Sequence, residues 1–165
     1  MKLLWDSLKI SIAGAKLSHL VQKDGIWDYG SMVEQVKAIF FKVKRIKNNG
    51  NVEGLEKYLS ERCFGKIEEE LDELEKNGKA WIIRNLLIKE VSIIEISVAK
   101  NENPDCFTAL IKAIGVEFIA DKKNVAELIN YSDKIKNFSE QWSFVRRGEW
   151  WVLDNIKSKR IFKVE

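Results

Sequence analysis

The apolar and polar positions between residues 31 and 46 repeat with the period of an α-helix. Ser31 can cap the start of this helix, and Asn48-Asn49-Gly50 is typical of its end. The chain is therefore predicted to form an amphipathic helix here. Its apolar stripe consists of Val33, Val36, Ile39, Phe40, Val43 and Ile46.

A second helical pattern follows after a short helix predicted over residues 52–59. Ser60 can cap it, and Asn77-Gly78 stops it. We expect its many acidic groups to face water. The apolar line of this helix is Phe64, Ile67, Leu71 and Leu74.

After Gly78 the pattern changes to that of β-strands. The stretch Leu86–Val98 is rich in isoleucine and valine, and we expect it to form a strand. Residues 106–120 form a nearly continuous apolar run that predicts a central strand. Two further strands are predicted over 138–146 and 150–156, joined by a turn at Arg147-Gly148-Glu149. The predicted faces are Ile94, Ile96 and Val98 on the first strand, Phe107, Ala109, Ile111 and Ile119 on the second, and Phe138, Trp142 and Phe144 on the third.

Helices that come first and a sheet that comes last indicate the α+β class. We predict N-terminal helices packed on a curved antiparallel sheet of about four strands, with a polar connection over 121–139 that holds a short helix around 124–130. The strand 106–120 is apolar on both faces, either because it is central or because its second face is covered. The candidate covers are the segment 1–23, a second copy of the chain, or a ligand.

Residues 1–23 are apolar and basic, but their apolar positions spread around a helical wheel instead of forming one stripe. Gly14 lowers the helix propensity further. The segment is either a helix packed on the domain or an arm that binds lipid or a partner. We therefore divide the chain into an N-terminal arm or extra helix, 1–30, and an α+β domain, 31–165. The candidate contact residues are Lys2, Leu4, Trp5, Leu8, Lys9, Ile12 and Lys16.

Charge and length fit one intracellular domain. The chain has 165 residues, 45% of them hydrophobic and 32% charged, with a net charge of +3. No apolar run of about 18 residues is present, and Asp6 and Lys9 interrupt any signal sequence. Cys63 and Cys106 form no disulfide framework. We expect a cytoplasmic protein that meets a membrane, if at all, at its surface.

The sequence offers little for catalysis. Its single histidine, His19, has no nucleophile signature beside it and is interpreted as a surface residue. The three cysteine and histidine residues are scattered, which does not favour structural zinc, and no phosphate-binding glycine loop occurs. Glu95, Glu117 and Glu140 could line a cavity, although an exposed strand face explains them equally well. We predict no catalytic, cofactor or metal site.

Tryptophans gather beside arginines in the last predicted hairpin. Trp142, Trp150 and Trp151 lie close in sequence to Arg146 and Arg147. Such a set can bind single-stranded nucleic acid by stacking. Core packing, with a cation over a ring, is the commoner use of these residues and is the interpretation that we favour.

The same hairpin resembles the closing strands of the Tim44-like domain family. The residues that carry the likeness are Trp142, Phe144, Arg146, Trp151, Leu153 and Ile156. The likeness extends over residues 31–157 and implies a cone-shaped fold like that of nuclear transport factor two, with helices in the concavity of the sheet and a pocket. It also implies a binding or scaffold role, because the mitochondrial family member tethers an import motor at a membrane and contacts acidic lipid.

Three functions stay open. The first is a non-catalytic binding or adaptor module, a peripheral-membrane or protein-translocation-related scaffold that meets a protein partner or an acidic membrane surface through 1–23. The second is a pocket for a small apolar ligand, or a cone-fold enzyme of the isomerase or dehydratase kind, which rests on fold analogy. The third, and least expected, is single-stranded nucleic-acid binding. We also predict a homodimer through the second sheet face.

Overall fold

The chain folds as helices followed by one sheet, which confirms the predicted α+β class. The computed structural model describes residues 2–127 and 135–162, with side chains for 4–124 and 135–157. The helices and strands are α1 (Lys2–Leu20), α2 (Tyr29–Asn49), α3 (Glu61–Lys76), β1 (Lys79–Ser97), β2 (Cys106–Asp121), β3 (Ile135–Arg147) and β4 (Trp150–Phe162), with short 3-10 turns η1 (Gly25–Trp27), η2 (Leu55–Lys57) and η3 (Lys122–Glu127).

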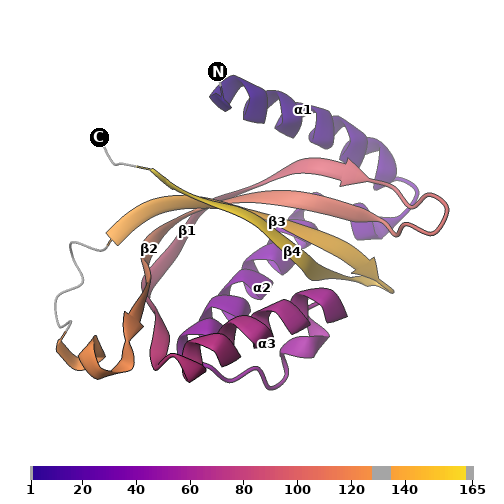
Figure 1. Cartoon of the computed structure of the whole chain (residues 1–165). Helices are drawn as coiled ribbons and strands as arrows, with labels where there is room; N and C mark the ends of the chain where they lie inside the picture. Colours follow the sequence, from indigo (N-terminus) through magenta and orange to yellow (C-terminus); the bar gives the residue numbers. More distant parts are fainter. Residues whose placement is uncertain (1, 128–134, 163–165) are drawn as a thin grey trace.

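The four strands form an antiparallel sheet in the order β1-β2-β3-β4. The sheet is twisted and bent, with α2 and α3 on its concave side and α1 on the opposite side (Figure 1). The prediction that 106–120 is a central strand is therefore confirmed. Helix α1, one of the three candidate covers named from the sequence, packs on the neighbouring strand β1.

Helix α2 begins earlier than predicted, because the cap is Asp28 and not Ser31. The Asp28 carboxylate accepts a hydrogen bond from the Ser31 backbone N–H at 2.9 Å. The helix ends where predicted, at Gly50, whose φ of 77° suits a residue without a side chain. Its buried face carries the predicted Val36, Ile39, Phe40 and Val43.

The prediction for α3 is confirmed at its start, where the Ser60 hydroxyl accepts a hydrogen bond from the Cys63 N–H. Cys63 and Ile67 are buried, and the acidic residues of the helix are exposed. The helix predicted over 52–59 is wrong in type and length. Only the 3-10 turn η2 forms, because Gly54 takes a φ of 82° just before it and cannot continue an α-helix backward.

Strand β1 includes most of the predicted strand Leu86–Val98 but begins earlier, at Lys79, where the pattern changes after Gly78. The proposed face of Ile94, Ile96 and Val98 is wrong. A register shift between Ile93 and Glu95 interrupts the alternation. Ile94 is buried and Ile96 is half-buried, whereas Val98 lies beyond the end of the strand and is exposed.

In β2 the predicted face of Phe107, Ala109 and Ile111 lies in the main core. Ile119, predicted on the same face, is exposed, because it lies near the end of the strand, away from the core. On the other face Leu110 is buried as well, which explains the continuous apolar run in the sequence.

Strands β3 and β4 form the predicted hairpin, closed by Gly148 with a φ of 63°. Phe138, Trp142 and Phe144 are buried in the core, as predicted. Both strands are longer than expected, so much of the polar connection over 121–139 is strand or the 3-10 turn η3. The rest of the helix predicted around 124–130 lies outside the described residues.

Aromatic rings from helix and sheet fill the space under the concave face. The Phe40 ring of α2 lies 5.1 Å, centroid to centroid, from Trp142 of β3. Phe107 stacks on Phe144 at 5.0 Å and meets Trp151 edge-on at 4.8 Å. Such pairs contribute about 0.5–1.5 kcal/mol each beyond the apolar area that they bury.

Replacing glycine by alanine should change the stability of the fold in opposite directions at two positions, Gly115 and Gly65. A Cβ on Gly115 of β2 would lie 3.0 Å from the Cα of Leu86, whereas a Cβ on Gly65 of α3 meets nothing within 4 Å. We expect Gly115→Ala to destabilise the fold by about 1–3 kcal/mol and Gly65→Ala to stabilise it by about 0.5–1 kcal/mol. Urea denaturation measures both. Equal effects of the two substitutions would contradict the close approach of β1 and β2 at Gly115.

Candidate functional site

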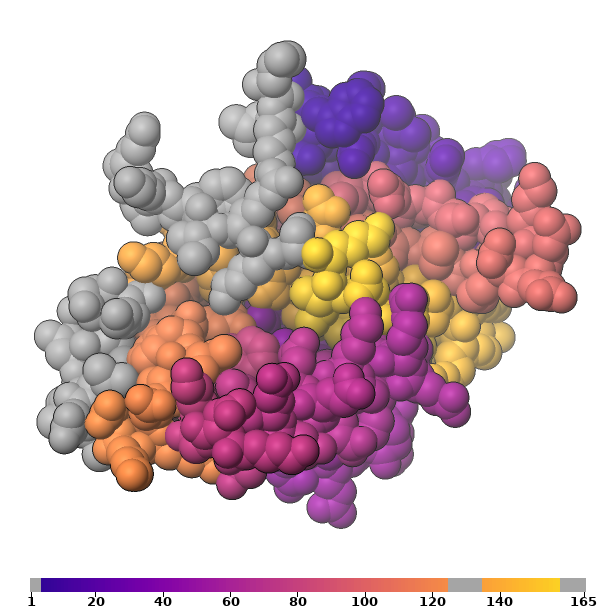
Figure 2. Space-filling view, in the orientation of Figure 1, coloured from indigo at the N-terminus to yellow at the C-terminus, as the bar shows by residue number. Residues whose placement is uncertain are grey.

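Helix α1 presents a row of apolar side chains to solvent. Leu4, Trp5, Leu8 and Ile12 are 76%, 59%, 49% and 50% exposed. Their spacing places them on one side of the helix. Figure 2 shows α1, in indigo, at the outer surface of the molecule. We call these four residues the α1 stripe. Exposed large apolar groups that lie together on one element mark contact surfaces more often than scattered ones do.

The opposite side of α1 packs on the protein. Ala13 and Leu17 are buried and belong to the main core cluster. The helix is thus apolar on two sides, which explains why its apolar positions spread around the helical wheel. The predicted arm is a single helix that is attached to the domain at its C-terminal end. After Leu20 the chain continues directly into η1, where Ile26 and Trp27 are buried.

Lysines border the α1 stripe. Lys16 is exposed, and the Lys9 ammonium lies 3.8 Å from a carboxylate oxygen of Glu95 on β1. The side chain of Lys2 lies outside the described residues. Of the seven predicted contact residues, the structure therefore brings Leu4, Trp5, Leu8, Lys9, Ile12 and Lys16 to one region of the helix.

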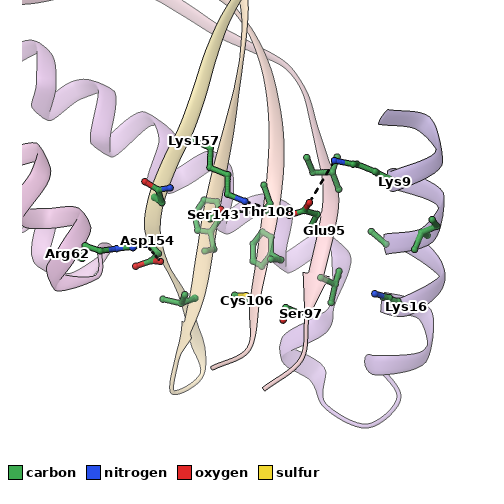
Figure 3. Close-up of a pocket in the computed structure, with 18 residues that line it drawn as sticks. Lys9, Lys16, Arg62, Glu95, Ser97, Cys106, Thr108, Ser143, Asp154 and Lys157 are labelled. Carbon is green, nitrogen blue, oxygen red and sulfur yellow. Dashed lines mark hydrogen bonds and ion pairs between the residues drawn. The ribbon is translucent and has the colours of Figure 1, made fainter. Parts of the chain in front are cut away.

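A groove of about 540 Å³ lies between α1 and the outer face of the sheet (Figure 3). Ile12 and Ala13 form part of one wall, and the hydroxyls of Thr108 and Ser143 lie on its floor, 3.1 Å apart. Cys106 also lines it and carries a free thiol. This groove could not be predicted from local patterns, because its residues come from all four strands, α1 and α3.

Charged side chains edge the groove, and most of them are paired. Glu95 lies between Lys9 and Lys157, the latter at 3.6 Å, so it serves two lysines and is not a free base. Asp154 accepts a hydrogen bond from Arg62 at 2.6 Å. Figure 3 shows Lys9 reaching from α1 toward Glu95 and Lys157 crossing the floor from β4. The rim carries more positive than negative groups.

The other two candidate acids form a buried ion cluster under the concave face. The Lys44 ammonium of α2 lies 2.9 Å from Glu117 of β2 and 2.7 Å from Glu140 of β3. Trp81 and Trp142 donate their indole N–H groups to Glu117 and Glu140 at 3.1 and 2.9 Å. Lys44 also lies within 6 Å of the ring centroids of Phe40, Phe138 and Trp142.

This cluster is poorly suited to acid–base catalysis. Both carboxylates are bound to one ammonium and to an indole, and their side chains are almost completely buried, so a substrate cannot reach either one as a general base. Aromatic rings fill the surrounding space. Sequence reasoning considered the two glutamates but missed Lys44, because nothing in the local pattern distinguishes a buried lysine on α2 from its exposed neighbours.

The single histidine and the buried cysteine do not form an activated nucleophile. His19 is exposed, as interpreted from the sequence. Burial raises the pKa of the Cys63 thiol to about 11, and the Asp154 charge acts in the same direction. A thiol with such a pKa is almost wholly protonated at neutral pH. Among the described residues, no group of three or more histidine, cysteine, aspartate or glutamate side chains is placed to hold a metal ion.

The residues of the hairpin motif pack in the core or bind neighbouring loops. Trp142, Phe144, Trp151 and Leu153 are buried, and Ile156 is half-buried against the core. The Trp151 indole donates to the Ile26 carbonyl oxygen at 3.1 Å, which ties β4 to η1. Arg146 binds Asp24 at 2.5 Å and Asp105 at 3.2 Å. The motif thus closes one end of the sheet against the loops on either side of it.

The same surroundings weaken the nucleic-acid hypothesis. Arg147 donates to the backbone oxygens of Leu59 and Glu56 at 2.8 and 3.2 Å, and Arg146 is bound to two aspartates. Trp150 is 68% exposed, whereas Trp142 and Trp151 are buried. One exposed tryptophan beside two engaged arginines does not form a stacking platform.

Comparison with known proteins gives the family. The model of the Tim44-like domain matches residues 13–158. The chain belongs to the Tim44-like domain family. The match begins inside α1 and ends in β4, so it includes every strand and the buried Ala13 and Leu17, while the α1 stripe precedes it. The family resemblance inferred from the last hairpin is confirmed.

Two solved structures resemble the Tim44-like chain. The intermembrane space region of the chloroplast protein ARC6 is 12% identical, with 79% of this chain and 96% of that one covered and a TM-score of 0.44. A de novo designed β-sheet protein is 14% identical, with 81% and 89% covered and a TM-score of 0.37. No curated protein sequence matches the chain. Neither structural likeness is close enough to carry an argument about function.

No helix within the described part of this Tim44-like chain has both the length and the apolar character needed to span a membrane. The division into an arm of 1–30 and a domain of 31–165 stays a prediction. The burial of Ala13 and Leu17 in the core favours counting α1 as part of the domain and not as a separate arm.

The buried cluster predicts a large loss of stability in Lys44→Met. The substitution leaves two carboxylates buried without their cation, and breaking a buried ion pair in this way costs about 3–5 kcal/mol. Lys37→Met on the same helix removes an exposed lysine that is paired only with Glu34, and should cost less than about 1 kcal/mol. Urea denaturation of both variants tests the difference. Similar midpoints would show that Lys44 is not held in a buried ion cluster.

Asp24 predicts a pH-dependent contribution to stability. The hydrogen bond from Arg146, followed by that from the Ile26 N–H, holds the pKa of this carboxyl below its ordinary value of 3.8. Because the folded-state pKa is the lower one, the contribution is complete above the unfolded pKa and is lost as the pH falls through the folded one. Asp24→Asn should therefore lower the free energy of unfolding at pH 7.

The same deficit should shrink as the pH falls below about 4. Urea titrations of wild type and Asp24→Asn across this range measure the gap, with Glu34→Gln as a control for an exposed acid on α2. A gap that stays constant down to acid pH would contradict a depressed pKa at Asp24.

Proposed function

We propose that this Tim44-like chain is a non-catalytic adaptor that attaches to an acidic membrane surface through α1. The observation that carries the proposal is the α1 stripe, whose four large apolar residues point to solvent on a helix that the core already holds through its opposite side. Burial of such side chains releases about 25 cal/mol per Å² of apolar surface. A helix that lies in the membrane interface would bury the whole row at once.

Charge supports an acidic surface over a neutral one. Lys16 is exposed beside the α1 stripe, and Lys9 is half-exposed next to it. Each lysine near an anionic membrane contributes about 1 kcal/mol, and the attraction falls off within about 10 Å at moderate salt. The proposal therefore includes a cytoplasmic location with reversible membrane attachment. A scaffold role near protein translocation is its finer part and rests on the family alone.

The α1 stripe can be tested without removing the helix. Deleting residues 1–23 would also remove Ala13 and Leu17 from the core, so loss of binding could then reflect misfolding. The double variant Trp5→Ser/Leu8→Ser keeps every charge and changes only exposed positions. Leu87→Ser on β1 is the matched control, because Leu87 is an equally exposed apolar residue on a different element.

We expect the wild type and Leu87→Ser to co-sediment with vesicles that contain acidic phospholipid, and the double variant to stay in the supernatant. High salt should weaken the binding of the wild type, and neutral vesicles should bind it less. If the wild type fails to sediment with any vesicle, the membrane part of the proposal is wrong, and a protein surface becomes the partner expected for the α1 stripe. The predicted homodimer is a separate claim, which sedimentation equilibrium of the free protein tests.

A further inference from the structure

Lys47 lies in the last turn of α2 with its side chain 7% exposed. Its ammonium nitrogen sits 4.0 Å from the ring centroid of Trp81 on β1. The closest carboxylate oxygen, from Glu70 on α3, is 3.7 Å away, which is too far for a hydrogen bond. Within the described residues, this buried amine has an ion-pair partner and a ring partner but no hydrogen bond.

The amine borders a cleft of about 300 Å³ between the ends of α2 and α3 and the start of β1. Trp81 and Leu71 line it together with Lys47. A cleft of this volume admits a molecule of a few heavy atoms. The side chain is therefore buried from bulk water and still reaches a space that a small molecule can enter.

The electrostatic surroundings favour the neutral amine more than those of a surface lysine do. Burial lowers the pKa of Lys47 below its ordinary value, and the charge of Lys44, one turn earlier, lowers it further. Glu70, Glu117 and Glu140 oppose this shift. The net direction is downward, so at neutral pH a larger share of Lys47 carries the free lone pair that a nucleophile needs.

The other charged groups that line the cleft are Asp72, Glu75, Lys79 and Lys122. All four are exposed, and Lys122 is ion-paired with Glu75. Water screens exposed charges strongly, so these groups change the state of the buried amine less than Lys44 and Glu70 do.

We propose that Lys47 is a covalent modification site at which a small aldehyde, entering the cleft, condenses with the side-chain amine. The neutral amine attacks the carbonyl carbon, a C–N bond forms, and the carbonyl oxygen takes up a proton. The resulting carbinolamine takes up one proton from solvent and loses water to give a protonated imine. The atoms balance with water as the single by-product, and no oxidant or reductant takes part.

The surroundings of Lys47 disfavour reaction with carbon dioxide more than condensation with an aldehyde. A protonated imine keeps the attraction of the Glu70 carboxylate and of the Trp81 ring face. A carbamate would reverse the charge. A carbamate would also place an anion beside Glu70 in a poorly solvated space.

Helix α2 supplies its own controls for a labelling experiment. Lys37 is exposed on the same helix, and Lys44 is buried there but held by two carboxylates. The intact protein is incubated near neutral pH with acetaldehyde and sodium cyanoborohydride, which reduces the imine to a stable secondary amine. Peptide mass mapping at early times then gives the rate at each lysine.

We expect Lys47 to be alkylated several-fold faster than Lys37, and Lys44 to stay unmodified. The advantage of Lys47 should diminish at strongly alkaline pH, because the neutral share of an amine then no longer depends on its surroundings. Alkylation of Lys47 at the same rate as Lys37, or more slowly, would overturn the proposal.

Lys47→Arg is the second measurement. It keeps a cation over Trp81 and removes the nucleophile, so the fast singly alkylated product should disappear while the circular dichroism spectrum stays unchanged. Persistence of that product would assign the fast reaction to another lysine and overturn the site. If the variant does not fold, the peptide map of the wild type still decides, because it compares lysines within one molecule.

Discussion

The fold depends on one buried ammonium placed between two carboxylates. Lys44 of α2 joins Glu117 of β2 and Glu140 of β3, so a single side chain fixes the helix against two neighbouring strands. Charges at this depth are costly unless they are paired and hydrogen-bonded, and the indoles of Trp81 and Trp142 each add one donor to the cluster. The cluster also favours one position of α2 along the sheet. Apolar contacts are not directional, whereas the ion pairs of Lys44 require one arrangement of α2, β2 and β3.

The cluster decides which side of the sheet is free for binding. With Phe40, Trp142 and the ion cluster in place, side chains fill the concave side, where a cone-shaped fold would otherwise hold its pocket. The larger groove, of about 540 Å³, lies on the outer face behind α1, and the cleft beside Lys47, of about 300 Å³, lies at the edge of the concave side. A pocket at the centre of the concave side is thus excluded by packing, whereas its edge and the outer face both keep space for a ligand.

The hydrophobic period and the capping rules predicted those features of the fold that depend on residues close together in the sequence. They gave the Ser60 cap and the common face of Phe138 and Trp142, because both follow from local spacing. They failed at Ile94, because a bulge in β1 shifts the alternation and leaves no mark in the sequence. They could not find the ion cluster either, since Lys44 and Glu117 are 73 positions apart and each resembles an ordinary exposed charge. The groove was missed for the same reason, as its walls come from distant segments.

Helix α1 has two apolar sides, one buried and one exposed, which a hydrophobic pattern alone cannot separate. A helix that only packs needs one apolar stripe, and an arm that only binds needs no core contact. Here Ala13 and Leu17, which pack, lie within the range that the family shares, and the α1 stripe lies before it. The packed side fixes how the exposed side is oriented on the domain, so a contact through the α1 stripe would cost less conformational entropy than one made by a disordered arm. A spread apolar pattern on a terminal helix is thus better interpreted as two faces than as weak amphipathicity.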